Sequence, residues 1–82
     1  MARFQILYWQ DLPSVIQAFA DDGSVVKRQL PEWFQQEIDR RAMEQGLVGS
    51  EAYLDEWRWG DVEERPGSPD DVLDALEREL SP

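Results

Sequence analysis

The chain has 82 residues, of which 41% are hydrophobic, and it carries a formal net charge of −10. A chain of this length buries only about two-thirds of the surface that it exposes when unfolded, so we predict one modest core and a single domain over residues 1–82. The lack of cysteine and histidine excludes disulfides, thiolate metal sites and cysteine nucleophiles, and it removes the commonest general base.

The apolar stretches are too short for a membrane-spanning or secretory segment. The N-terminal run over residues 4–9 is interrupted by Gln5. Nowhere does the chain approach the roughly 18 consecutive apolar residues that a spanning helix needs. We therefore expect a cytoplasmic protein that does not act on a membrane.

Most of the negative charge lies in the last third of the chain. Residues 1–50 contain seven acidic and five basic residues, whereas residues 51–82 contain eleven acidic and three basic residues. A surface of this sign repels nucleic-acid phosphates, so we expect no direct binding to a nucleic-acid duplex. Two explanations of the charge stay open, namely solubility and a basic protein partner.

The first thirty residues have the composition of three β-strands. In residues 3–9, aromatic and β-branched side chains alternate with others, which is typical of a strand with one well-buried face. Runs over residues 15–20 and 24–30 flank Asp21-Asp22-Gly23, and an Asp-Gly pair between two such runs is a strong hairpin signal. We predict a three-stranded antiparallel meander. Two sets of side chains compete for the buried face of the second strand: Val15 and Phe19 against Ile16, Ala18 and Ala20.

An amphipathic helix is predicted after Leu30-Pro31-Glu32. Proline occupies the tolerated first helical position there, and the acid lies near the positive end of the helix dipole. Phe34, Ile38 and Ala42 recur every four residues and form one apolar stripe. Gly46 is expected to end this helix in the left-handed conformation.

A short second helix is predicted over residues 50–60, with a serine as its N-cap. Residues two apart on a helix point about 200° apart, so we expect Trp57 in the core and Trp59 at an edge. Trp57 would share its apolar stripe with Tyr53 and Leu54. On a strand, by contrast, the two tryptophans would share a face.

The last third is predicted to contain a further helix. Ser68-Pro69-Asp70-Asp71 combines a serine cap, a proline at the first position and an acid three residues after the cap. Residues 61–65 are either a short fourth strand or a loop. The predicted fold class is α+β, with a three-stranded antiparallel meander followed by two to three helices packed on one face. The apolar stripe of the last helix consists of Val72, Leu73, Leu76 and Leu80.

No pattern in the sequence marks a catalytic, cofactor or metal site, and we predict none. The serines fall at turns, caps and the tail, without a histidine partner. Glu63 with Glu64, or Asp70 with Asp71, could supply paired carboxylates, but glycosidase chemistry needs a cleft that holds substrate between them. EF-hand, P-loop and dinucleotide-binding spacings are absent. We therefore expect a protein that is not an enzyme.

Tryptophans at the edge of the core are the best candidates for a binding surface, because exposed tryptophan is enriched among interface anchors. Trp33 lies about 100° away from the stripe of the first helix, and Trp59 lies beside an arginine. Half-burial at the flank of the core is the competing interpretation for each. The candidate interaction surface consists of Trp33, Arg58, Trp59, Glu63 and Glu64.

Residues spread along nearly the whole chain match a family pattern: Tyr8-Trp9, Asp11-Leu12-Pro13, Leu30-Pro31, Phe34, Ile38-Asp39, Ala42-Met43, Gly46-Leu47, Tyr53-Leu54 and Trp57. On these residues the sequence resembles the small bacterial family named the virulence factor domain. The resemblance implies either a short bacterial protein or a domain like that of larger chains similar to conserved virulence factor C. No activity or catalytic residue is established for the family, so the resemblance assigns none.

Taken together, these features favour a non-catalytic protein-interaction or adaptor module. Its expected partner is another protein, for which a basic surface would complement the acidic last third. Both a monomer and a homodimer are compatible with the sequence. Two other hypotheses stay open: an acidic mimic of nucleic acid that binds a basic partner, and a small carboxylate-based hydrolase or enzyme accessory.

Overall fold

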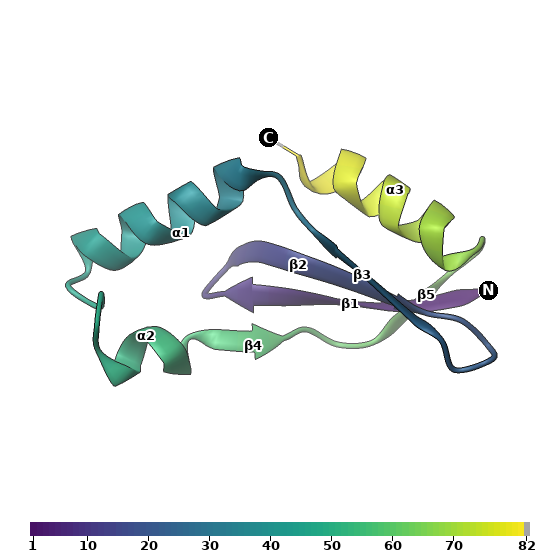
Figure 1. Cartoon of the computed structure of the whole chain (residues 1–82), viewed down its shortest axis with the longest axis horizontal. Helices are drawn as coiled ribbons and strands as arrows, with labels where there is room; N and C mark the ends of the chain where they lie inside the picture. Colours follow the sequence, from purple (N-terminus) through teal and green to yellow (C-terminus); the bar gives the residue numbers. More distant parts are fainter. Residues whose placement is uncertain (82) are drawn as a thin grey trace.

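The computed structural model describes residues 1–81 and has the predicted α+β fold (Figure 1). In Figure 1, α1 and α3 lie along one side of the strands, and α2 and β4 run below them. Among the described residues, no helix has the length and apolar character needed to cross a membrane. The elements are β1 (Ala2–Trp9), β2 (Leu12–Phe19), β3 (Val25–Gln29), α1 (Glu32–Glu44), α2 (Glu51–Asp55), β4 (Trp57–Trp59), β5 (Glu63–Arg65) and α3 (Pro69–Leu80).

The strands form one antiparallel sheet in the order β3-β2-β1-β4, and β5 also pairs with β1. β4 pairs with Leu7–Trp9 at one end of β1, and β5 pairs with Ala2–Phe4 at the other. Between them, the Gly60 N–H donates a hydrogen bond to the Ile6 carbonyl at 2.8 Å. A Cβ atom on Gly60 would lie 3.0 Å from the Tyr8 ring, so a side chain here would force that ring to move. β4 and β5 thus form one interrupted edge strand, and β5 is the optional fourth strand of the prediction.

The predicted second helix is wrong in its second half. α2 ends at Asp55, and Trp57–Trp59 form β4 because they pair with β1. Trp57 packs against a core cluster and Trp59 stays 42% exposed, as expected, but strand geometry places both side chains on the same face. Pairing with a distant strand has overridden a local helical spacing.

The larger core cluster lies between the sheet and α3. Ile16 and Ala18 are fully buried in it, whereas Val15 and Phe19, on the other face of β2, are half-buried. This settles which face of the second strand is buried. The cluster consists of Ala2, Phe4, Ile6, Ile16, Ala18, Leu30, Phe34, Val72, Leu73 and Leu76.

The first predicted helix is confirmed as α1. It buries the expected stripe of Phe34, Ile38 and Ala42. Gly46 follows in the left-handed conformation with a φ of 70°. The Leu47 N–H donates to the Ala42 carbonyl at 2.8 Å, which satisfies one of the carbonyls that the end of a helix leaves open.

A second core cluster closes the end of the β1–β2 hairpin, with Trp9 at its centre. The Trp9 indole N–H donates to the Tyr53 backbone carbonyl at 2.9 Å, and the two ring centroids lie 5.6 Å apart. A buried indole needs such a hydrogen-bond partner. The cluster consists of Trp9, Leu12, Ile38 and Ala42, with Leu47, Tyr53 and Trp57 packed against it.

α3 begins with the predicted cap. The Ser68 hydroxyl oxygen accepts a hydrogen bond from the Asp71 N–H at 3.2 Å, and the Asp71 carboxylate accepts one from the Ser68 N–H at 3.4 Å. This capping box satisfies two backbone donors that the first turn would otherwise leave open. The helix buries Val72, Leu73 and Leu76 against the sheet.

Two arginines from the sheet hold α3 in place. Arg28 on β3 pairs with Asp74, and Arg65 on β5 pairs with Glu79. Arg65 also lies over the Phe4 ring, 5.3 Å from its centroid. The hydrogen bonds from Arg65 hold the pKa of the Glu79 carboxyl below its ordinary value of 4.5. These pairs are largely exposed, so they orient the helix more than they stabilise it.

Acidification should weaken the attachment of α3 through Glu79. Because the pKa of Glu79 is lower in the folded than in the unfolded chain, its contribution to stability is complete above 4.5 and is lost as the pH falls through that value towards the folded-state pKa. We expect Glu79→Gln to reduce the fall in Tm on acidification, measured by circular dichroism at a series of pH values. Arg65→Gln removes the same pair from the other side and should have the same effect. A variant whose Tm falls as steeply as that of the wild type would contradict this role.

Candidate protein-interaction surfaces

Three large aliphatic side chains are exposed where α1 meets α2. Met43 in the last turns of α1 is 66% exposed, Val48 in the connecting loop 63%, and Leu54 in α2 66%. Neighbouring exposed apolar side chains of this kind mark interaction sites, whereas scattered single ones are ordinary. Leu54 was predicted on a buried stripe with Tyr53, and that prediction is wrong because the five-residue α2 turns only its Tyr53 side towards the core.

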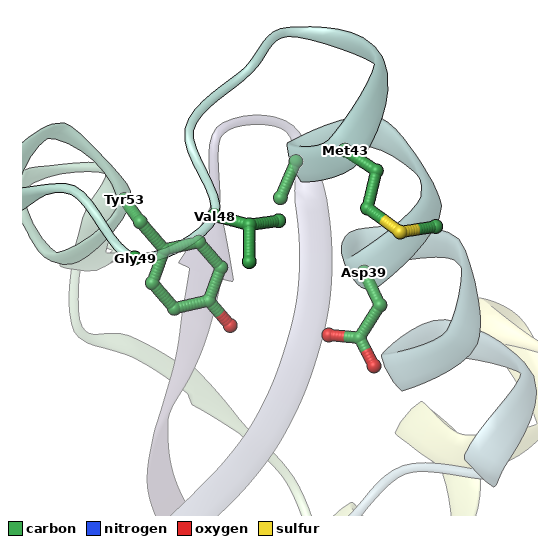
Figure 2. Close-up of a pocket in the computed structure, with 6 residues that line it drawn as sticks. Asp39, Met43, Val48, Gly49 and Tyr53 are labelled. Atoms are coloured by element: carbon green, nitrogen blue, oxygen red, sulfur yellow. The ribbon is translucent and has the colours of Figure 1, made fainter.

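A pocket of about 340 Å³ opens between α1 and the segment that leads into α2. Figure 2 shows Asp39 and Met43 of α1 on one side of the pocket, Tyr53 of α2 on the other, and Val48 between them. A second hollow of about 310 Å³ shares Gly49 and Tyr53 with it. The two hollows together are called the α1–α2 groove, which is lined by Asp39, Ala42, Met43, Val48, Gly49, Ser50, Glu51, Tyr53 and Leu54.

The loop between α1 and α2 is shaped by two glycines. Gly46 and Gly49 have φ angles of 70° and 78°, in the left-handed region that favours glycine. Between them, Leu47 packs into the second core cluster while Val48 is exposed. The Ser50 hydroxyl donates to the Leu47 carbonyl at 2.6 Å and ties the loop to the start of α2. The outward position of Val48 is therefore set by the backbone.

The Tyr53 side of the groove is held by the core beneath it. The Tyr53 ring lies 5.6 Å from the Trp9 ring and meets the Trp57 ring edge-on at 6.2 Å. Aromatic pairs in such geometries add about 0.5–1.5 kcal/mol each beyond the area that they bury. A wall that is already fixed loses little conformational freedom when a ligand binds against it.

All the charged side chains that line the groove are acidic. They are Asp39, whose carboxylate accepts a hydrogen bond from the Gln35 amide at 3.0 Å, and Glu51. Within residues 1–81, neither carboxylate forms an ion pair. Arg40 and Arg41 of α1 pair instead with acids outside the groove. The groove thus combines an apolar surface with uncompensated negative charge.

The sheet face opposite α3 is a second surface with apolar character, here called the outer sheet face. Cross-strand register places Val15, Leu7 and Trp59 in one row across it. In the adjoining row, the Gln17 amide donates to the Gln5 side-chain oxygen at 3.0 Å. This face mixes half-buried aliphatic side chains with a satisfied polar pair, and Trp59 lies at its edge.

The five residues of the predicted interaction surface do not come together. Arg58 and Trp59 lie on β4, and Glu63 and Glu64 on β5, along the same edge of β1. Register places Trp59 and Glu64 on the outer sheet face, and Arg58 and Glu63 on the face towards α3. Trp33 lies on α1, is 46% exposed, and packs edge-on against the neighbouring phenylalanine ring at 5.1 Å.

Sequence reasoning missed the groove because Leu54 was assigned to a buried stripe, and Met43 and Val48 belong to no apolar stripe. Met43 directly follows the stripe residue Ala42, and Val48 lies between two turn glycines. A large aliphatic residue outside every periodic stripe was the one available signal. Within residues 1–81, no group of acidic side chains is arranged to hold a metal ion.

The fold and the groove define a small α+β domain that exposes an apolar, acid-lined surface. A family model described as Virulence factor matches residues 7–82. The chain therefore belongs to the virulence factor family, which confirms the resemblance found in the sequence. No curated protein and no solved structure matches it.

Neighbouring residues on α2 should differ sharply in their effect on stability. Tyr53→Ala removes the ring that packs between two tryptophans, and we expect it to lower the free energy of unfolding by about 2 kcal/mol or more. Leu54→Ala changes an exposed side chain and should stay within about 0.5 kcal/mol of the wild type. Urea unfolding followed by tryptophan fluorescence measures both. Equal losses for the two variants would show that the groove is not held from below as described.

Proposed function

We propose that the chain is a non-catalytic, cytoplasmic module that binds another protein through the α1–α2 groove. The proposal is carried by one observation: exposed apolar side chains line both hollows of the groove, Met43 and Val48 in the first and Leu54 in the second. Exposing these apolar side chains to water costs free energy, and this cost is recovered when a partner covers them. The proposed function is therefore recognition of a partner protein, which contacts the chain at the groove.

The partner is expected to be basic. Asp39 and Glu51 contribute two negative charges at the groove, and the whole chain has a net charge of −10. Long-range attraction between opposite charges speeds encounter, and an unpaired carboxylate that becomes buried at an interface needs a cationic partner. A basic protein meets both requirements.

The interrupted edge strand offers additional contacts outside the groove. Trp59 is the anchor that we propose there, because a half-exposed tryptophan contributes a large apolar area and an indole donor. Arg58, Glu63 and Glu64 lie along the same edge and would add polar contacts around it. Trp33, at the start of α1, would contribute only to a partner that extends from the groove to that end of the helix.

The groove proposal predicts that Val48→Asp abolishes partner capture without unfolding the protein. Val48 is already 63% exposed, so the change should leave Tm nearly unaltered, whereas a carboxylate would oppose burial of the hollow under a partner. The measurement is affinity capture from an extract of the source cell, at low and high salt, with identification of the bound proteins by mass spectrometry.

Val25→Asp is the matched control for Val48→Asp. Val25 is 47% exposed and lies on β3, at the sheet edge opposite β4, so the control introduces the same charge outside both proposed contact surfaces. We expect wild type and Val25→Asp to retain the same specific proteins and Val48→Asp to lose them. If all three retain the same proteins, the groove is not the contact surface.

Trp59→Ala tests the contribution of the sheet edge. We expect it to weaken the complex with a captured partner by about tenfold, the loss typical of a moderate interface anchor, while the thermal midpoint hardly changes. Titration of the purified partner gives Kd, and calorimetry gives Tm. A large fall in Tm would instead show that Trp59 supports the core.

A further inference from the structure

The walls of the α1–α2 groove are helical, which limits how a bound segment can satisfy its own backbone. An extended peptide requires free backbone donors and acceptors on its receptor, as at the edge of a sheet. Six of the nine lining residues come instead from α1 and α2, and the α1 wall offers few free backbone groups, because its N–H and C=O groups bond within the helix except at the ends. A segment that carries its own backbone hydrogen bonds, namely a helix, is therefore the occupant that this groove favours.

The two hollows of the groove indicate more than one apolar anchor on the occupant. They adjoin at Gly49 and Tyr53, and Met43 and Leu54 stand at their separate ends. Apolar side chains that recur every three or four residues lie along one face of a helix, so one helix can fill neighbouring hollows. Gly49 has no side chain between the hollows, which lets a helix approach closely there.

The charges at the groove specify what lies beside those anchors. Asp39 lines the first hollow and Glu51 the second, and neither has a basic partner within residues 1–81. A helix that spans both hollows would bring its flanking positions close to both carboxylates. Lysine or arginine at those positions would be attracted, whereas acidic side chains would be repelled.

We propose that the α1–α2 groove binds a basic amphipathic helix of the partner protein, with its apolar face in the two hollows and its lysines or arginines beside Asp39 and Glu51. This inference rests on the proposed function and adds the conformation and chemistry of the bound segment to it. It also makes the groove distinct from the Trp59 edge, where exposed backbone would suit an extended segment.

The probe for this proposal is a labelled peptide of roughly 18 residues, about five helical turns, with leucines spaced three or four residues apart along one helical face and an equal number of lysines on the other. The comparison peptide has the same composition with leucine and lysine alternating, which favours a strand. A third peptide has glutamate in place of lysine. Fluorescence anisotropy gives the affinity of the full chain for each, and circular dichroism reports helix formed on binding.

Two pairs of variants locate the binding. Val48→Asp should weaken binding of the helical peptide by about tenfold or more, and Val25→Asp by no more than about twofold. Asp39→Asn with Glu51→Gln should weaken binding and reduce its salt dependence. Asp21→Asn with Glu32→Gln removes the same two charges outside both the groove and the interrupted edge strand, and it should reduce the affinity and its salt dependence far less. Leu54→Asp provides a second apolar test in case Val48→Asp disturbs the loop.

The outcomes separate the inference from the proposed function. Preference for the helical peptide, a gain in helix on binding and loss through the groove variants would support the inference. Equal binding of the alternating peptide, or equal effects of the two double carboxylate variants, would overturn it. If a captured protein is lost on Val48→Asp yet is not displaced by the helical peptide, the groove still binds a partner but the occupant is not this helix. If Val48→Asp changes no capture, the proposed function itself fails at this surface.

Discussion

The packing of Trp9 is the interaction on which the arrangement of this small domain depends. Its side chain is the largest that is fully buried, and its indole N–H is satisfied by the backbone of α2, 44 residues further along the chain. The Trp9 side chain packs in one cluster with residues from the tip of the first hairpin, the buried stripe of α1 and the start of β4. Without this cluster, α2 has no buried residue of its own to hold it.

The division of the core explains where apolar surface stays exposed. One cluster takes up the apolar face of α3 and most of the sheet, and the other is used to fix the hairpin tip. Eighty-two residues provide few further side chains to cover the second cluster. Met43, Val48 and Leu54 consequently stay in contact with solvent above it. These exposed side chains therefore lie on a base that the packed cluster holds in place.

The sequence was a reliable guide wherever local rules decide the outcome. The hairpin turn, the stripe of α1, the left-handed Gly46 and the cap at Ser68 all follow from the chemistry of a few adjacent residues. The three-residue strand that contains Trp57 and Trp59 could not be found in this way, because it exists only through pairing with β1 about fifty residues earlier. The groove was equally inaccessible, since the exposure of Val48 depends on how two helices are placed around a loop.

Gly60 limits how copies of this protein can associate through the edges of the sheet. Because it divides the edge of the sheet into two pieces of three residues each, no long straight ladder of open hydrogen-bonding groups is presented on that side. The opposite edge, β3, is five residues long and includes a lysine, which resists burial in a continued sheet. Both edges of the sheet are thus poor templates for fibril growth. The chain can therefore expose apolar side chains at one end without assembling through its strands.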